Sequence, residues 1–200
     1  MQQPAGVILA GGQSRRMGGG DKGLLHLGGE TLLSRVIDRL APQVSDLVLN
    51  ANGDNARFDV SLQVIADSID GFAGPLAGVL AGLDWAAAHG HTHIVTAAAD
   101  TPFFPCDLVP RLMLEAEDNP IVLAATPDPE RGLSRHPTFG LWPVALREDL
   151  RAALAEGLRK VVQWTDRHGT GVAEFGVEPF DPFFNVNTPA DMARAEALLR

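Results

Sequence analysis

One segment near the N-terminus constrains the fold of this chain more than any other. The run Gly6-Val7-Ile8-Leu9-Ala10 is short, apolar and rich in β-branched residues, and it stops at the pair Gly11-Gly12. An apolar run of this length that ends at glycines is typical of a strand buried on both faces of a parallel sheet. We therefore predict a first strand that leads directly into a shaped loop.

The rest of the first half alternates between helical and strand periodicity. Apolar residues recur at helical spacing over 31–40, 75–88 and 107–117. Short apolar runs predict strands over 47–49, 62–66, 93–98 and 121–125. Helices that alternate with strands in this way predict an α/β fold with an open, mostly parallel central sheet.

The pattern after Pro127 is less regular. It predicts a loop through His136, a strand over 138–142, helices within 145–167 and short strands near 172 and 184. A last helix is better marked, because Thr188-Pro189-Ala190-Asp191 supplies an N-cap, a proline in the first turn and an acid three positions on. With 200 residues, no repeat and no linker, we expect one domain whose two parts meet near Pro127.

The charge distribution indicates a local anion site. The formal net charge of −9 disfavours a general nucleic-acid binder, because such proteins present positive surface to phosphate backbones. Between Ser14 and Leu24, however, three basic residues stand against one acid; they are Arg15, Arg16 and Lys22, and the acid is Asp21. We also expect a soluble, cytoplasmic protein, because the chain has one cysteine, no signal segment and no apolar run long enough to span a bilayer.

The loop after the first strand suits phosphate groups. Its glycines let backbone amides approach an anion, and its basic side chains offset the charge. The loop does not match the P-loop motif, in which glycine directly precedes the lysine and Ser or Thr follows it. Lys22 instead follows Asp21 and precedes Gly23. The letters of the dinucleotide fingerprint occur in 18–23, but too far beyond the strand to form its immediate turn. The other reading is a surface loop with incidental basic residues, and phosphate binding explains its position after a strand better.

Polar residues at the ends of predicted strands complete a candidate site. Asn50, Asp67 and Asp100 follow strands, and Asn185 and Asn187 directly precede the capped helix. Asp100 suits Mg²⁺, which takes one or two protein oxygens while it keeps several waters. Residues of these types also form turns and caps, so both readings stay open for each of them.

The loop and the motifs that follow it resemble those of the molybdenum cofactor guanylyltransferases, the MobA family. The loop matches Leu-Ala-Gly-Gly-x-Ser-x-Arg-Met-Gly followed by a lysine. Further matches occur in the same order at 50–52, 66–68, 74–78, 100–102, 136–138 and 185–189, and so cover most of the chain. One departure is Ala99, where relatives often have a cysteine before the acid.

The resemblance implies a Rossmann-like, three-layer nucleotidyltransferase fold. The change of pattern after Pro127 predicts nucleotide binding in 1–126 and substrate binding in 127–200. The resemblance also implies transfer of GMP from GTP to molybdenum-molybdopterin, which forms a guanine dinucleotide cofactor and releases pyrophosphate. Catalytic roles would fall to Lys22, Arg16 and Asp100, with Asp100 as the ligand of Mg²⁺. The predicted binding residues are Leu9, Ala10, Gly11, Gly12, Lys22, Asn50, Asp67, Asp100, Asn185 and Asn187.

Two other residues keep two interpretations each. His136 either contacts the second substrate or belongs to a rigid loop before a strand, and Gly78 marks either close helix packing or the approach of a ligand.

Two alternative functions stay open for the whole protein. One is a related enzyme that transfers CMP or forms a sugar nucleotide, and the other is a non-catalytic GTP-binding interaction module. For partners we expect small-molecule substrates, no nucleic acid and no membrane, and a monomer that makes transient contacts with cofactor-assembly proteins and recipient molybdoenzymes.

Overall fold

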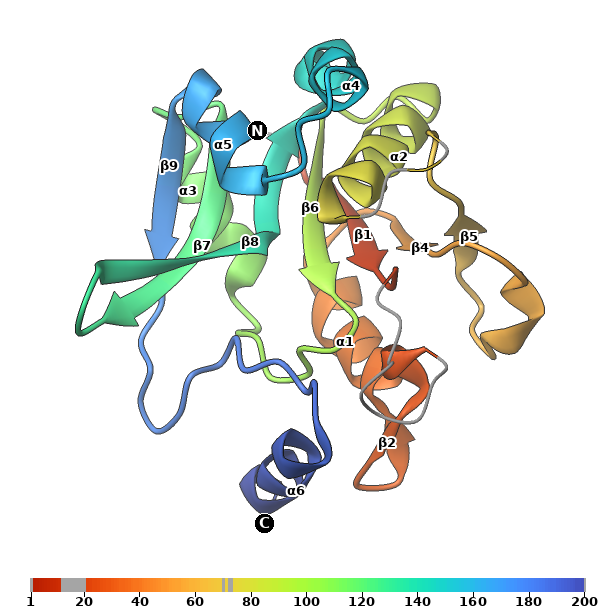
Figure 1. Cartoon of the computed structure of the whole chain (residues 1–200), viewed down its shortest axis with the longest axis vertical. Helices are drawn as coiled ribbons and strands as arrows, with labels where there is room; N and C mark the ends of the chain where they lie inside the picture. The colour runs from red at the N-terminus through yellow and green to blue at the C-terminus, as the bar shows by residue number, and fades with distance from the viewer. Residues whose placement is uncertain (1, 12–20, 70, 72–73, 200) are drawn as a thin grey trace.

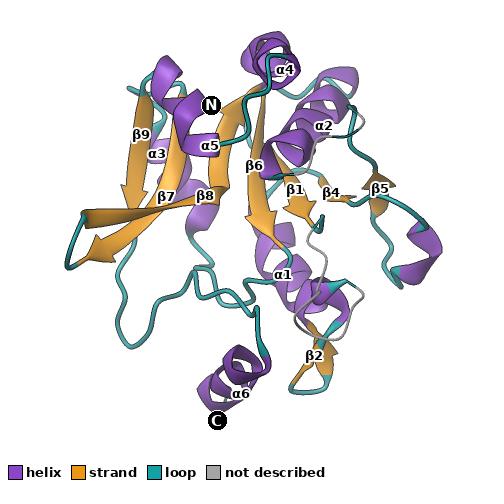
Figure 2. Ribbon diagram, in the orientation of Figure 1, coloured by secondary structure: helices purple, strands orange, loops and turns teal. Residues whose placement is uncertain are grey.

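A central sheet runs through the molecule, with helices on both of its faces (Figure 1, Figure 2). Within residues 2–11, 21–69, 71 and 74–199, which the computed structural model describes, seven strands form this sheet. They are β1 (Ala5–Leu9), β4 (Leu47–Asn50), β5 (Gln63–Ile65), β6 (His93–Ala98), β7 (Ile121–Asp128), β8 (Gly132–Pro143) and β9 (Thr170–Glu174). A separate hairpin pairs β2 (His26–Leu27) with β3 (Glu30–Thr31).

Helices connect the strands. The α-helices are α1 (Leu32–Leu40), α2 (Pro75–Ala88), α3 (Leu108–Glu115), α4 (Arg147–Ala155), α5 (Val161–Thr165) and α6 (Pro189–Leu198). Short 3₁₀ turns are η2 (Lys22–Leu24), η3 (Ala41–Gln43), η4 (Asn55–Arg57), η5 (Val144–Leu146) and η6 (Asp166–His168). The alternation of strands and helices confirms the predicted α/β class.

The strand order is β5-β4-β1-β6-β8-β7-β9, and within the described part of this seven-stranded sheet β8 is the strand that runs antiparallel to both of its neighbours. From β1 the chain adds β4 and β5 on one side, and α2 then carries it back to place β6 on the other side of β1. The direction of winding therefore reverses between β1 and β6. In open α/β sheets, ligands bind beyond the carboxyl ends of the strands at such a switch point.

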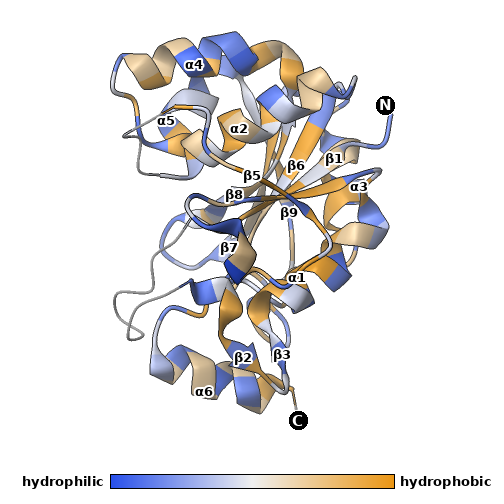
Figure 3. Ribbon diagram, turned by 90° about the vertical axis from the view of Figure 1, so that its right-hand side faces the viewer, coloured by the Kyte–Doolittle hydropathy of each residue, from blue (hydrophilic) through white to orange (hydrophobic). Residues whose placement is uncertain are grey.

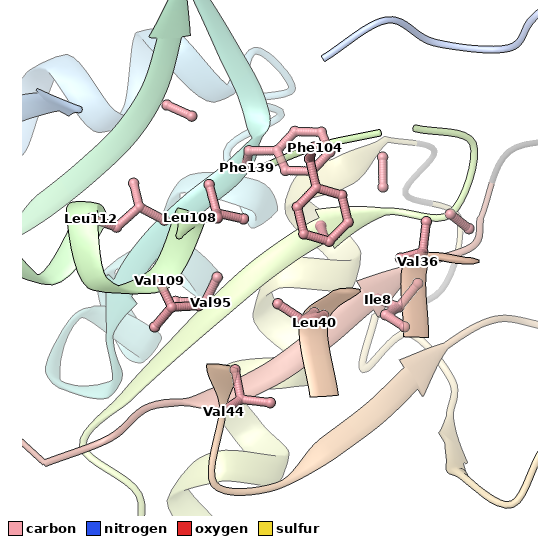
Figure 4. Packing of buried hydrophobic residues seen from close by; sticks show 14 of the residues in the cluster. Ile8, Val36, Leu40, Val44, Val95, Phe104, Leu108, Val109, Leu112 and Phe139 are labelled. Carbon is pink, nitrogen blue, oxygen red and sulfur yellow. The ribbon is translucent and has the colours of Figure 1, made fainter. Parts of the chain in front are cut away.

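Two apolar layers hold the helices against the sheet, because neighbouring residues of a strand face opposite sides. Ile8 and Val95 face α1 and α3, and the packing around them includes Phe104 and Phe139 (Figure 4). The adjacent residues Val7 and Ile94 face the other side, where they pack with α2, α4 and α5. Figure 3 shows the sheet edge-on between these two groups of helices, which is the predicted three-layer arrangement.

A third, smaller apolar cluster lies beyond the carboxyl ends of β1 and β6. It joins the β2–β3 hairpin, the segment after β6 and helix α6 through Leu27, Leu32, Phe103, Val186 and Ala195. Figure 1 shows α6 and β2 on the side toward which the arrows of β1 and β6 point. This cluster therefore brings the C-terminal helix to the switch-point edge of the sheet.

The predicted elements of the first half agree with the structure within a few residues at each end, and α2 and β6 agree at both ends. The predicted loop through His136 is wrong, because His136 lies inside β8 and pairs with Ala124. A register shift between Leu123 and Ala124 leaves Pro137, Thr138 and Phe139 without partners in β7. A proline and polar residues inside a strand hide it from a pattern that rests on apolar alternation.

One further expectation also fails. The predicted strand near 184 is wrong, because residues 181–188 form a turn and an extended segment without a strand. Asp181 Oδ1 accepts a hydrogen bond from the backbone N of Phe183 at 2.9 Å, which stabilises the turn. The single cysteine of the chain, Cys106, is exposed, and Arg39 Nη1 lies 3.3 Å from its Sγ.

Candidate functional site

The backbone at the switch point is fixed by hydrogen bonds that continue past the ends of the strands. Ala10 N donates to Asn50 O at 2.9 Å, and Ala99 N donates to Leu9 O at 3.1 Å. These bonds hold the residues that follow β1 and β6 side by side. The glycine-rich loop therefore starts, at Gly11, next to the segment that carries Asp100.

Lys22 is the residue on which this edge converges. Its Nζ lies 3.4 Å from Asp100 Oδ2 and also donates to Asn187 Oδ1. Gly23 lets η2 approach the end of β6 closely, since a Cβ on Gly23 would lie 3.3 Å from the Cβ of Ala99. The side chains of Lys22 and Asp100 keep 21% and 20% of their surface exposed, so an incoming anion or cation can reach both.

The segment before α6 is attached directly to the segment after β6. Val186 N donates to Asp100 O at 2.8 Å, and Thr101 Oγ1 donates to Asn185 Oδ1 at 2.5 Å. Thr101 is fully buried, so its hydroxyl has few alternative partners. The carboxylate of Asp100 and the amides of Asn185 and Asn187 are therefore neighbours in the folded chain, although 85 or more residues separate them in sequence.

The cap of α6 fixes the orientation of Asn187. Asp191 Oδ2 accepts from the backbone N of Asn187 at 3.0 Å and of Thr188 at 2.9 Å, while Asp191 N donates to Thr188 Oγ1 at 3.2 Å. Partial desolvation raises the pKa of the Asp191 carboxyl, but the hydrogen bonds from Thr188 and Asn187 together leave that pKa below its ordinary value. The predicted N-cap is thus present as a reciprocal capping box.

A second group of polar side chains lies at the ends of β4 and β5. Asn50 Nδ2 donates to Asp67 Oδ1 at 3.0 Å, and Asn52 Nδ2 donates to Asp67 Oδ2 at 2.8 Å. Asn52 Oδ1 also accepts from the backbone N of Asp67 at 2.9 Å. Asp67 is therefore held in one orientation by two asparagines from the neighbouring strand end.

Helix α2 packs against this second group without a side chain in between. A Cβ on Gly78 would lie 2.3 Å from Asn50 Oδ1 and 2.8 Å from Leu9 Cδ2. Real Cβ atoms essentially never show contacts this short, so a side chain at this position would force Asn50 or Leu9 to move. Gly78 thus reflects close packing of the helix against a candidate binding residue.

The oxygen donors of the site suit a divalent cation that is completed by substrate. Among the described residues, no three side chains of His, Cys, Asp or Glu are grouped to hold a metal ion. Asp100 is instead a single carboxylate beside Asn185 and Asn187. Mg²⁺ characteristically binds through one or two carboxylates together with substrate phosphates and waters, so this donor set fits Mg²⁺ rather than a closed protein cage.

Comparison with known proteins decides the family of the chain. A model of the MobA-like NTP transferase domain matches residues 6–170. A molybdenum cofactor guanylyltransferase from Bradyrhizobium sp. (strain ORS 278) is 54% identical, over 96% of this chain and 92% of its own length. One from Mesorhizobium japonicum is 50% identical over 98% and 96%.

The chain belongs to the MobA-like NTP transferase family.

Solved structures agree with this assignment. Molybdopterin-guanine dinucleotide biosynthesis protein A from Archaeoglobus fulgidus has 25% sequence identity and a TM-score of 0.73, with 98% of each chain covered. A 2-C-methyl-D-erythritol 4-phosphate cytidylyltransferase from Thermus thermophilus, with 21% identity and a TM-score of 0.75, shares the fold over 99% of this chain and 98% of its own. The chain is therefore a nucleotidyltransferase with a Rossmann-like fold.

In this MobA-like chain the predicted site residues form two groups along one sheet edge. Lys22, Asp100 and Asn187 form the first, with Asn185 beside it, and Asn50 and Asp67 form the second. Leu9, Ala10 and Gly11 lie between the two groups at the end of β1. Gly12, Arg15 and Arg16 lie outside the described residues. The binding and catalytic roles of all these residues stay predictions.

Sequence reasoning missed four residues that hold these groups together, namely Asn52, Arg57, Thr101 and Asp191. Asn52 and Thr101 lie within motifs of the MobA-like family, and Asp191 was recognised only as a cap. Arg57 belongs to no motif that the sequence analysis identified. A role in positioning other residues leaves a signal only in three-dimensional contacts, which periodicity cannot reveal.

His136 lies on β8 near the same edge of the sheet. Its ring stacks on Phe183 with the centroids 4.3 Å apart, and its Nε2 lies 2.9 Å from Thr126 Oγ1. Burial lowers the pKa of His136, and the nearby Asp181 carboxylate opposes part of that shift. Contact with a second substrate stays a prediction for His136.

Proposed function

We propose that the protein transfers GMP from GTP to the terminal phosphate of molybdenum-molybdopterin, with release of pyrophosphate. The observation that carries this proposal is the contact of Lys22 with both Asp100 and Asn187 at the switch-point edge, in a chain that is 54% identical to a molybdenum cofactor guanylyltransferase. The proposal is supported by the position of this cation, carboxylate and amide oxygen at the switch-point edge, because ligands of open α/β sheets bind there.

The reaction requires positioning and charge neutralisation more than it requires a protein nucleophile. A terminal phosphate oxygen of the cofactor attacks the α-phosphorus of GTP. A new P–O bond forms, the bond between the α-phosphorus and the bridging oxygen breaks, and pyrophosphate leaves with the electron pair. Because both reactants are anionic, preorganised cations and amides supply most of the barrier reduction.

On this proposal Lys22 binds the β- and γ-phosphates and stabilises the pyrophosphate as it leaves. Arg16, on the glycine-rich loop, offsets further negative charge on the triphosphate. Mg²⁺ held by Asp100, with Asn185 or Asn187 as a further oxygen, would supply charge stabilisation to the phosphate oxygens when bound. The backbone of Leu9, Ala10 and Gly11 would approach the phosphates without side-chain obstruction, as expected for an anion-binding loop.

The second polar group is proposed to hold the nucleoside. Asn50 and Asp67 lie at the ends of adjacent strands, and hydrogen bonds from Asn50 and Asn52 fix the carboxylate of Asp67. A carboxylate in a fixed orientation can accept from a guanine edge or a ribose hydroxyl with little loss of conformational entropy. This side of the site would therefore select the nucleotide, and the Lys22 side would carry the chemistry.

The test is a turnover assay with purified molybdenum-molybdopterin, Mg²⁺ and each of GTP, CTP, ATP and UTP in turn. Pyrophosphate release and formation of a guanine dinucleotide with GTP alone are the expected results. Preferential turnover of CTP would replace the proposal with a CMP transferase. Binding of GTP without pyrophosphate release would replace it with a non-catalytic GTP-binding module.

The cellular setting is part of the proposal. In the described ranges no helix combines the length and the hydropathy that crossing a bilayer requires. We place the reaction in the cytoplasm, which the single cysteine of the chain supports. A monomer that contacts cofactor-assembly proteins and recipient molybdoenzymes transiently is the proposed form, and size-exclusion chromatography of the purified protein tests it.

A further inference from the structure

Arg57 joins two loops that come from different parts of the sequence. It ends the turn η4 between β4 and β5, and its Nε makes an ion pair with Asp21 Oδ2 across 36 positions of sequence. Its Nη2 donates to Asn52 O at 2.7 Å, and its Nη1 donates to Asp54 O. The guanidinium also lies over the ring of Phe58, 4.2 Å from the centroid. Three nitrogens and one face of this side chain are thus engaged.

The loop on one side of Arg57 is the one that orients Asp67. The carbonyl to which Nη2 donates belongs to Asn52, and both ends of the Asn52 side chain bind Asp67. Gly53, with a φ of +87°, turns the chain back toward Arg57, so that a Cβ at this position would lie 3.6 Å from Nη1. Fixing the backbone of Asn52 therefore fixes the carboxylate on the proposed nucleoside side of the site.

The loop on the other side of Arg57 carries the proposed phosphate ligand. Asp21 directly precedes Lys22, and Lys22 Nζ contacts Asp100 and Asn187. The ion pair is partly buried, since the side chains of Arg57 and Asp21 keep 27% and 20% of their surface exposed. A continuous series of polar contacts consequently runs from Asp67 through Asn52 and Arg57 to Asp21, the residue directly before Lys22.

We propose that Arg57 is a positioning residue that couples the nucleoside side of the site to its phosphate side. This inference rests on the proposed function, because it assigns those two sides to one bound nucleoside triphosphate. A guanidinium suits the task, because its planar fork presents several donors at fixed angles, which a lysine ammonium on a flexible stem does not. With the two loops tied together before the nucleotide arrives, less conformational freedom is lost on binding.

The test compares Arg57→Ala and Arg57→Lys with the wild-type protein and with Arg151→Ala as the matched control. Arg151 makes an ion pair with Asp84 at 2.5 Å between α4 and α2 and contacts no predicted site residue in the described structure. Arg57→Ala should raise KM for GTP by about tenfold, the size expected for a residue that couples contacting groups. Because the chemistry lies with other residues, kcat should change much less.

Further variants separate positioning from general stabilisation. Arg57→Lys should recover little of the lost GTP affinity, and Asp21→Asn should raise KM in the same direction as Arg57→Ala. The double variant Arg57→Ala/Asp21→Asn should be no worse than Arg57→Ala, since both substitutions break one link. Arg151→Ala should leave KM for GTP unchanged. Calorimetric titration with GTP and Mg²⁺ provides the same comparison without turnover.

The inference is overturned if Arg57→Ala lowers the melting temperature but leaves KM and Kd for GTP unchanged, or if Arg57→Lys restores wild-type values. Asp21→Asn keeps the test decisive where Arg57→Ala fails to fold, because an unchanged KM in Asp21→Asn rejects the link. Failure of the proposed function is distinguishable, since it would appear as absent GTP turnover in the wild-type protein itself.

Discussion

At the scale of single residues, the site depends on side chains that are held by other side chains. Asn50 illustrates this, because Asp67 accepts from its amide and α2 presents a glycine to its oxygen. The sequence marks Asn50 and Gly78 as unusual, but only the structure shows that the side chain of Asn50 occupies the space that a Cβ at position 78 would need. Periodicity predicts the helix that contains Gly78 and cannot predict what its backbone touches.

Gly78→Ala should disturb Asn50 directly. The new methyl group would lie 2.3 Å from Asn50 Oδ1, so the side chain must move and the folded state should lose about 1 to 3 kcal/mol. Kinetic assays should show a higher KM for GTP together with a lower melting temperature. Gly82→Ala is the matched control, because its methyl group would meet Val7 in the core at 2.7 Å, and it should lower stability without a comparable rise in KM.

Asp100→Asn should remove the charge that the proposed Mg²⁺ site requires while it preserves the size of the side chain. We expect turnover of GTP to fall on the order of a hundredfold or more, because a carboxylate that anchors the metal acts on the charge of the transition state. Steady-state kinetics with varied Mg²⁺ measures this loss. Turnover close to that of the wild type at ordinary Mg²⁺ would reject Asp100 as the metal ligand.

At the scale of elements, the C-terminal helix matters for the site through its first turn. The capping box of α6 fixes Asn187, which contacts Lys22. The sequence predicts this helix start from Thr188 and Pro189, because capping chemistry is local. That Asn187, just before α6, contacts Lys22 depends on the tertiary fold, which local sequence patterns do not contain.

Thr188→Ala should therefore affect both stability and binding. Loss of an N-cap hydroxyl costs about 1 kcal/mol of stability. Thr31→Ala, at the start of α1, removes an equivalent cap that accepts from Ser34 N at 3.0 Å, and it serves as the control. Thermal denaturation should show similar losses for both variants, whereas only Thr188→Ala should raise KM for GTP. An equal rise in both would contradict the assigned role of the α6 cap.

The stack of His136 on Phe183 joins β8 to the segment before α6. Because the imidazole of His136 is partly buried there, the stability of the protein should depend on pH. Burial depresses the pKa of His136 in the folded protein below its ordinary value of 6.5. The unfolded chain therefore binds the proton more readily, and stability should fall as the pH drops below about 6.5. Melting temperatures measured across this range should decline less for His136→Gln than for the wild type.

His93 provides the internal comparison for that measurement. Burial lowers the pKa of His93 as well, so His93→Gln should also reduce the pH dependence. The two effects should add, because His93 pairs with Pro143 whereas His136 pairs with Ala124, so the two imidazoles occupy separate positions in the sheet. A pH dependence that is unchanged in His136→Gln would show that its imidazole does not titrate differently on folding.

At the scale of the whole molecule, the sequence predicts more of the fold than of the site. Buried parallel strands such as β1 and β6 are recognisable because both faces require apolar residues. The second half is harder to predict, because β8 contains His136 and Pro137 where a register shift interrupts its pairing with β7. The site combines residues from both halves, so its geometry depends on the strand order, which no local pattern contains.

The net charge of −9 is consistent with a protein that concentrates its anion affinity at one edge. The most direct test of that claim is calorimetric titration of the wild-type protein and Lys22→Ala with GTP in the presence of Mg²⁺. We predict one GTP bound per wild-type chain and an affinity at least about tenfold lower for Lys22→Ala, as expected when a bond to a charged group is lost. Equal affinity in the two proteins, or no heat from the wild type, would contradict the account.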